Sequence, residues 1–166
     1  SLKDVKSTIS PSMDIQISSN FERQLFESLE YNSDELSNLM KLFIKNKEYD
    51  VKGKIHDNLK LYYKSKGIDD ELTSLTIKQF YDNYKYISDP HTATSLNILK
   101  ELRNDDTNVA LACAHPAKFP DAIKNSIGKY PDQPEPLKKI MGEEEKYINL
   151  DNDSEIVKNY ILENIS

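Results

Sequence analysis

Apolar side chains recur at helical spacing over the first third of the chain. They form two stripes, separated by the polar residues Asn32, Ser33 and Asp34. Spacings of three and four residues place side chains on one face of a helix, and the polar break suits a turn and a helix cap. The pattern predicts one helix from near Ser19 and a second after the break. The stripes consist of Phe21, Leu25, Phe26 and Leu29, and of Leu36, Leu39, Met40, Phe43 and Ile44.

Start and stop signals divide the middle of the chain into further helices. Gly67 is expected to close a short helix, because glycine readily adopts the backbone conformation that ends helices. Thr76 and Gln79 stand three residues apart and match a capping box, which marks the first turn of a helix. The predicted buried face of this second helix consists of Ile77, Phe80, Tyr81 and Tyr84.

Two prolines mark helix starts in the second half. Asp89 precedes Pro90, and this pair suits a helix start because aspartate accepts from the first-turn amides while proline has no amide hydrogen to satisfy. The helix is predicted to run to about Arg103. A further helix is predicted to begin at Pro120 and to end at Gly128.

A short apolar run between these helices predicts a strand. The run begins at Asn108 and ends at Cys113, and a polar, proline-bounded loop follows at residues 114–120. Apolar runs of this length are typical of parallel strands that are buried on both faces, and such strands deliver residues to a site at their carboxyl end. The expected fold class is therefore α/β and dominated by helices, which flank one or two parallel strands.

The last part of the chain is expected to change character twice. Prolines make residues 129–136 irregular, and residues 147–150 suggest a last short strand. Asp153 is then expected to cap a final helix. The apolar stripe predicted to pack inward from that helix consists of Ile156, Val157, Tyr160 and Ile161.

Composition narrows the classes of partner. The chain has 166 residues, which suits one domain, and its formal net charge of −6 leaves no basic stripe for a nucleic acid. No apolar run approaches the roughly 18 residues that a membrane-spanning helix needs. The single cysteine, Cys113, has no partner for an intrachain disulfide, which fits a reducing compartment, so a cytoplasmic protein is expected.

Motifs that carry chemistry are few when the residues are taken alone. The sequence has no glycine-rich phosphate loop, no Cys/His cluster at zinc spacing and no serine nucleophile elbow. Cys113 and His115 could be a thiol and its base, but a buried thiol followed by a loop imidazole is favoured. Lys118 could form a Schiff base, although most lysines are simply solvated. The acidic run at residues 143–145 suits a solvated turn better than a metal site.

Three blocks of residues together resemble one enzyme family, the longer threonine synthases. The first is Pro-Ser-Met-Asp-Ile-Gln-Ile-Ser-Ser-Asn-Phe-Glu-Arg at residues 11–23. The second is Asp-Pro-His-Thr-Ala at residues 89–93, and the third is Ala-His-Pro-Ala-Lys-Phe-Pro at residues 114–120. The blocks stand in the same order as in the family. The resemblance implies a tryptophan-synthase-beta-like fold, with residues 1–166 as the carboxyl-terminal portion: part of the cofactor-binding large domain plus a carboxyl-terminal extension.

The resemblance also implies a reaction and a cofactor. Threonine synthases convert O-phosphohomoserine and water to threonine and phosphate with pyridoxal phosphate, as carbon-oxygen lyases. The family's Schiff-base lysine and its Gly/Asn-rich phosphate loop lie upstream of the first block, so this chain alone is expected to be inactive and not to hold the cofactor stably. It is expected either to pair with the missing amino-terminal part of the same protein or to form a homodimer.

Site residues follow from the resemblance only at matching positions. Cys113 stands where the family commonly has Thr or Ser beside the cofactor's pyridine nitrogen, and a thiol is a weaker donor than a hydroxyl. Lys118 matches a motif lysine other than the Schiff-base lysine. Asn20, Arg23, His91 and His115 belong to the blocks without an assigned role. The competing interpretation is a stand-alone, mainly helical interaction module without catalysis.

Overall fold

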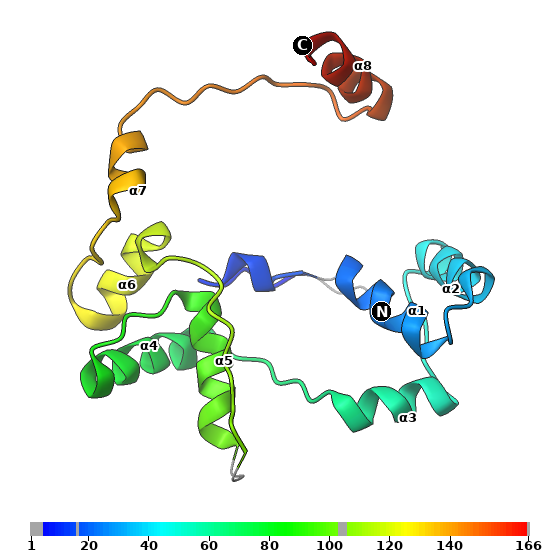
Figure 1. Ribbon diagram of the computed structural model, residues 1–166, viewed down its shortest axis with the longest axis horizontal. Coiled ribbons are helices and arrows are strands. Elements are labelled where there is room, and N and C mark those ends of the chain that lie inside the picture. Colours follow the sequence, from blue (N-terminus) through cyan, green and yellow to red (C-terminus); the bar gives the residue numbers. More distant parts are fainter. Residues whose placement is uncertain (1–4, 16, 103–105, 166) are drawn as a thin grey trace. The chain divides into compact units, whose positions relative to one another are not determined.

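The computed structural model describes residues 5–15, 17–102 and 106–165, and the chain forms two compact units (Figure 1). The first unit extends to Asp132 and the second begins at Gln133, and each is described by itself. The helices of the first unit are η1 (Pro11–Met13), α1 (Ser19–Ser28), α2 (Ser33–Asn46), α3 (Gly53–Tyr62), α4 (Asp70–Tyr84), α5 (Pro90–Glu101), η2 (Pro116–Lys118) and α6 (Pro120–Ile127). Those of the second are α7 (Glu135–Ile140) and α8 (Ser154–Asn164).

Helix α1 packs against both α2 and α3. The two predicted helices are confirmed, with Leu25 and Phe43 buried from their apolar stripes. Asn32 caps α2, since its side-chain oxygen accepts from the Glu35 amide at 3.1 Å. Helix α3, however, ends five residues before Gly67, because the backbone of Tyr63 is already extended. The prediction that Gly67 ends this helix is wrong.

Helix α4 begins earlier than the capping-box pattern predicts. The carboxylate of Asp69 accepts from the Leu72 amide at 2.8 Å and so caps the helix about two turns before Thr76. Thr76 lies fully buried inside α4, and its hydroxyl donates to the Leu72 carbonyl at 2.8 Å. The capping-box prediction at Thr76 and Gln79 is therefore wrong, because an acidic cap stands upstream.

The core of the first unit lies where α5 and α6 meet α4 (Figure 1). Ile77, Ala93 and Ile123 contribute one fully buried side chain from each of these helices. The predicted starts of α5 and α6 at their prolines are confirmed, and α6 ends at Gly128, whose φ of 79° is left-handed. Helix α5 ends at Glu101, and Arg103, the predicted end, lies outside the described residues.

The predicted strands are not confirmed, since no strand occurs among the described residues. No strand is assigned to residues 108–113, and Val109 and Leu111 are 73% and 75% exposed instead of buried. A parallel strand is defined by a hydrogen-bonded neighbour, so an apolar run alone does not make one. No strand is assigned to residues 147–150 either, and these residues are exposed. The helix-dominated part of the expected α/β class is confirmed.

The second unit holds α7 and α8. Asp153 caps α8 as predicted, accepting from the amides of Glu155 and Ile156 at 2.9 and 3.1 Å. The prediction that the apolar stripe of α8 packs inward is wrong, because no residue of this helix is buried and Ile161 is 50% exposed. The predicted irregular segment stops early, since α7 begins at Glu135. Within the described ranges, none of the helices combines the length and apolarity needed to cross a membrane.

Candidate functional site

The carboxylate of Asp89 is the most highly connected polar group in the second half of the first unit. It is 1% exposed and caps α5, with Oδ1 accepting from the amides of His91 at 2.9 Å and Thr92 at 3.3 Å. Removing a charged group from water is costly unless hydrogen bonds replace the lost hydration. The further partners of Asp89 provide that replacement: the Thr92 hydroxyl and the His91 ring belong to α5, and the Ala114 amide comes from outside the helix.

The second carboxylate oxygen of Asp89 binds the segment that precedes η2. Oδ2 accepts from the Thr92 hydroxyl and from the Ala114 amide, the latter at 3.2 Å. The Thr92 hydroxyl in turn accepts from the Cys113 amide at 2.9 Å. Two consecutive backbone amides of the predicted strand end are therefore anchored to the first turn of α5.

His91 connects the same carboxylate to the beginning of the chain. Its ring is almost completely buried, with Nδ1 3.1 Å from Asp89 Oδ1, and its Nε2 accepts from the Ser12 amide at 3.1 Å. Because Nε2 accepts, the ring is neutral and Nδ1 carries the hydrogen that it donates to Asp89. The ring also packs edge-on against Phe119, with centroids 4.9 Å apart.

These contacts bring the three sequence blocks together at one point. We call the group of Asp89, His91, Thr92, Ser12, Cys113 and Ala114 the Asp89 cluster. Motif reasoning identified the Asp89 cap but missed the other partners of its carboxylate. The signal available in the sequence was that a cap aspartate, an imidazole and a hydroxyl all stand within the four residues Asp89 to Thr92.

The pKa of Asp89 reflects opposing effects. Burial raises it, but the hydrogen bonds from the Thr92 hydroxyl, the Ala114 and Thr92 amides and the His91 ring outweigh burial, so the pKa lies below its ordinary value of 3.8. A group whose pKa is lower in the folded than in the unfolded protein stabilises the fold above its unfolded pKa. That contribution is lost as the pH falls through the folded pKa.

We therefore expect an acid-dependent difference between the chain and its Asp89→Asn variant. Above the ordinary pKa of 3.8 the difference in free energy of unfolding should be constant. It should shrink as the pH falls below that value, because the unfolded chain then takes up a proton at Asp89 while the folded carboxylate, whose pKa is lower, keeps its charge. Urea unfolding followed by circular dichroism between pH 7 and pH 3 measures both curves. A difference that stays constant to pH 3 would contradict the assignment.

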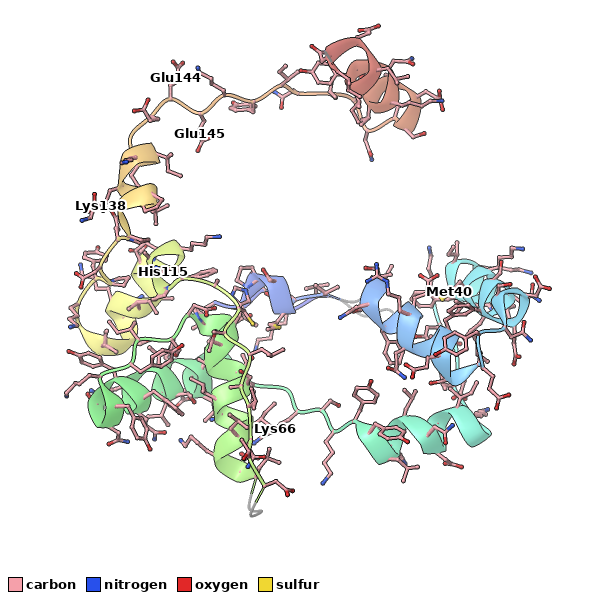
Figure 2. All side chains as sticks on the ribbon, in the orientation of Figure 1. Met40, Lys66, His115, Lys138, Glu144 and Glu145 are labelled. Carbon is pink, nitrogen blue, oxygen red and sulfur yellow. The ribbon has the colours of Figure 1, made fainter. Side chains whose placement is uncertain are left out.

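Cys113 lies at the surface of the described structure. Its thiol is exposed and contacts the Leu111 carbonyl at 3.6 Å, so the expectation of a buried thiol is wrong. His115 uses its Nδ1 to accept from the Ala117 amide at 3.1 Å and so caps η2, just before α6 (Figure 2). Since each group has another partner, the structure does not join Cys113 and His115 as a thiol and its base.

The remaining candidate residues are not members of the Asp89 cluster. Lys118 is exposed. Asn20 accepts from the Phe21 amide at 3.1 Å at the start of α1. Arg23 lines a groove of about 720 Å³ between α1 and α2, together with Met40, which Figure 2 labels. Residues 143–145 are exposed on an extended segment after α7, and no group of three or more potential metal ligands is found where the chain is described.

Comparison with known proteins identifies the family. Residues 92–161 match the family model "Threonine synthase, C-terminal". The threonine synthase of Saccharomyces cerevisiae is 34% identical over 188 residues, covering 98% of this chain and 37% of the relative. That of Pseudomonas aeruginosa is 33% identical over 157 residues, covering 93% of this chain and 34% of the relative.

Solved structures agree with the sequence matches. A PLP-bound threonine synthase from Brucella melitensis aligns with a TM-score of 0.78 and 34% identity, covering 96% of this chain and 34% of that one. The yeast threonine synthase aligns with a TM-score of 0.77 and 33% identity, covering 98% and 37%. The chain thus spans about a third of the length of these relatives. It belongs to the threonine synthase family and corresponds to a carboxyl-terminal part of those enzymes.

Proposed function

We propose that this chain is the carboxyl-terminal part of a pyridoxal-phosphate-dependent threonine synthase. The whole enzyme would convert O-phosphohomoserine and water to threonine and phosphate, with the Schiff-base lysine and the phosphate loop supplied by an amino-terminal part. The observation that carries the proposal is the convergence of the three sequence blocks at the Asp89 carboxylate. The alignment to a threonine synthase with bound PLP over 96% of the chain supports it.

The residues present suit one side of a cofactor pocket. Pyridoxal phosphate, when bound, supplies an electron-withdrawing ring that stabilises negative charge on the substrate carbons. The thiol of Cys113 is exposed next to a rigidly bonded backbone, so it is available as a neutral partner for the ring's pyridine nitrogen. A thiol donates more weakly than a hydroxyl, so this contact would be weaker than the Thr or Ser contact it replaces.

The other residues of the Asp89 cluster would act on the shape of the pocket. His91 holds the Ser12 amide and thereby the η1 turn, while Thr92 and Asp89 hold residues 113 and 114. Each of these side chains is buried. Their contribution would be orientation and exclusion of water from the pocket wall, and the proton transfers of the reaction would fall to groups of the amino-terminal part.

The described chain also leaves apolar surface for a partner. Val109 and Leu111 of the segment 108–113 are largely exposed. We propose that the lysine-bearing amino-terminal part covers this segment, and that a homodimer of the chain is the alternative occupant when that part is missing. A location in the cytoplasm fits the free thiol of Cys113. The matches over almost the whole chain favour this proposal over a stand-alone interaction module.

Cofactor labelling tests whether the Schiff-base lysine lies in the amino-terminal part and not in this chain. The purified chain, treated with pyridoxal phosphate and borohydride, is expected to give no stoichiometric covalent adduct, because Lys118 is an ordinary exposed lysine. The chain joined to a lysine-bearing amino-terminal part should bind the cofactor and release phosphate from O-phosphohomoserine. Peptide mass mapping and a phosphate assay measure the two results.

The Lys118→Arg variant is the matched control, because it keeps the charge and removes the reactive amine. In the joined protein it should retain a full cofactor adduct. A stoichiometric adduct on Lys118 in the isolated chain would overturn the assignment of the Schiff base to another part. A joined protein that binds cofactor but releases no phosphate would overturn the proposed reaction.

A further inference from the structure

We propose that Thr92 is a positioning residue that sets the place of Cys113 through its backbone. The inference deepens the proposed function and rests on it, since Cys113 matters only if the chain forms one wall of a cofactor pocket. Thr92 would touch neither cofactor nor substrate. It would act by holding the Cys113 amide, so that the side chain at position 113 always starts from the same place in the pocket wall.

The hydrogen bonds of the Thr92 hydroxyl can run in only one direction. An ionised carboxylate accepts and cannot donate, so the single hydroxyl hydrogen of Thr92 goes to Asp89 Oδ2. A lone pair of the same oxygen is then left for the Cys113 amide at 2.9 Å. The side chain of Thr92 is 2% exposed, so water does not compete for either bond. The order Cys113 amide, Thr92 hydroxyl, Asp89 carboxylate is therefore fixed.

A second bond fixes the direction of the segment. The Ala114 amide donates to Asp89 Oδ2 at 3.2 Å, so two consecutive amides are bound to groups of the same helix start. One anchored amide leaves a segment free to pivot, whereas two adjacent ones hold it. Asp89 and Thr92 thus together hold the backbone of residues 113 and 114 in one orientation.

The thiol itself contributes little to this arrangement. Its contact with the Leu111 carbonyl is 3.6 Å long, and a thiol is a weak donor. Cys113 is also exposed, so packing does not hold its side chain. The backbone hydrogen bonds, which we call the tether, would therefore place any small side chain at position 113 in the same way. The position of this side chain would not depend on whether it is a thiol or a hydroxyl.

Removing the Thr92 hydroxyl should therefore loosen residues 113 and 114. In Thr92→Val the Cys113 amide loses its acceptor, and its hydrogen exchange is expected to accelerate about tenfold or more. Thr92→Ser keeps the hydroxyl and should restore slow exchange. Thr94→Val is the matched control, because the Thr94 hydroxyl donates to the His91 carbonyl in the same helix and does not touch Cys113. Amide exchange of the chain measured by NMR gives these rates.

The variant Cys113→Ser tests the same point without changing a buried side chain. Amide exchange at positions 113 and 114 should stay within about twofold of the wild type, because the tether runs through the backbone. Faster exchange in this variant would mean that the thiol holds the segment, which would overturn the proposal even if Thr92→Val does not fold.

The cofactor-bound protein supplies the second readout. In the chain joined to its lysine-bearing part, Thr92→Val should change the visible absorption of pyridoxal phosphate and weaken its binding about fivefold, and Thr92→Ser should restore both. Unchanged amide exchange in Thr92→Val would overturn the tether. Faster exchange with an unchanged cofactor spectrum and affinity would overturn the positioning role. A wild-type joined protein that binds no cofactor would overturn the proposed function, and the exchange result would identify the tether as structural only.

Discussion

Replacing Asp89 by alanine is expected to lower the free energy of unfolding by about 3–5 kcal/mol. The change removes the acceptor for the amides of His91, Thr92 and Ala114 and for the Thr92 hydroxyl. The His91 and Thr92 donors are then left buried without an acceptor. Each buried donor without a partner costs free energy, and here several lose their partner together. Urea unfolding of the chain and its variant at neutral pH measures the loss.

Two other aspartates provide matched controls, because they cap helices at the surface. Asp69 accepts from the Leu72 amide at the start of α4, and Asp153 accepts from the Glu155 and Ile156 amides at the start of α8. Replacing either by alanine is expected to cost only about 1 kcal/mol, the usual value of a helix cap. If Asp89→Ala costs no more than these two, the carboxylate is an ordinary cap and does not join the three segments.

Truncating Ile77 to alanine is expected to cost about 2–5 kcal/mol. This side chain is completely buried and packs in one cluster with Ala93 of α5 and Ile123 of α6. Its removal would leave a cavity at the point where α4 meets both neighbours, and a rigid core relaxes only partly into such a space. Thermal and urea unfolding of Ile77→Ala measure the loss.

Leu75 serves as the control on the same helix, because it is 46% exposed. Leu75→Ala removes a similar number of carbon atoms but should change the free energy of unfolding by only about 0.5 kcal/mol. Ile77→Val should fall between the two, at about 1 kcal/mol. Equal losses from Ile77→Ala and Leu75→Ala would show that α4 is not packed as described.

Helices were predictable from the sequence where a cap residue and an apolar stripe coincide. Asn32, Asp89 and Asp153 all cap helices as expected, and Gly128 ends α6. These signals depend only on residues close together in the sequence, so they can be recognised before any tertiary contact is known. The capping-box prediction at Thr76 failed because another local signal, the aspartate cap at Asp69, lies upstream and starts the helix.

Burial was predicted less well than helix boundaries. The stripe of α8 and the run at residues 108–113 are apolar enough for a core, yet both are largely exposed in the described structure. The hydrophobic pattern predicts which face of a helix or strand is apolar. Whether that face is buried depends on other segments that pack against it. For the run ending at Cys113 the described residues provide no such cover, and the role of Cys113 toward a cofactor stays a prediction.

The candidate site depended on contacts that no sequence window contains. Ser12 and His91 stand 79 residues apart, and Asp89 and Ala114 stand 25 apart, yet both pairs are hydrogen-bonded. The three blocks could be recognised separately, and their resemblance to one family predicted that they belong together. The carboxylate that joins them could be identified only from the fold.

The bond between Ser12 and His91 also affects where the chain can tolerate insertions and deletions. A second long-range bond, from the Ile9 amide to Asp70 Oδ1 at 3.0 Å, holds the same amino-terminal stretch at the start of α4. Helices α1, α2 and α3 therefore lie in a loop of chain whose two ends are held together. Doubling the length of such a loop costs only about 0.6 kcal/mol in chain entropy. Insertions and deletions between residues 24 and 68 are thus expected to cost little stability, whereas a change of spacing within a block would displace hydrogen-bonded residues.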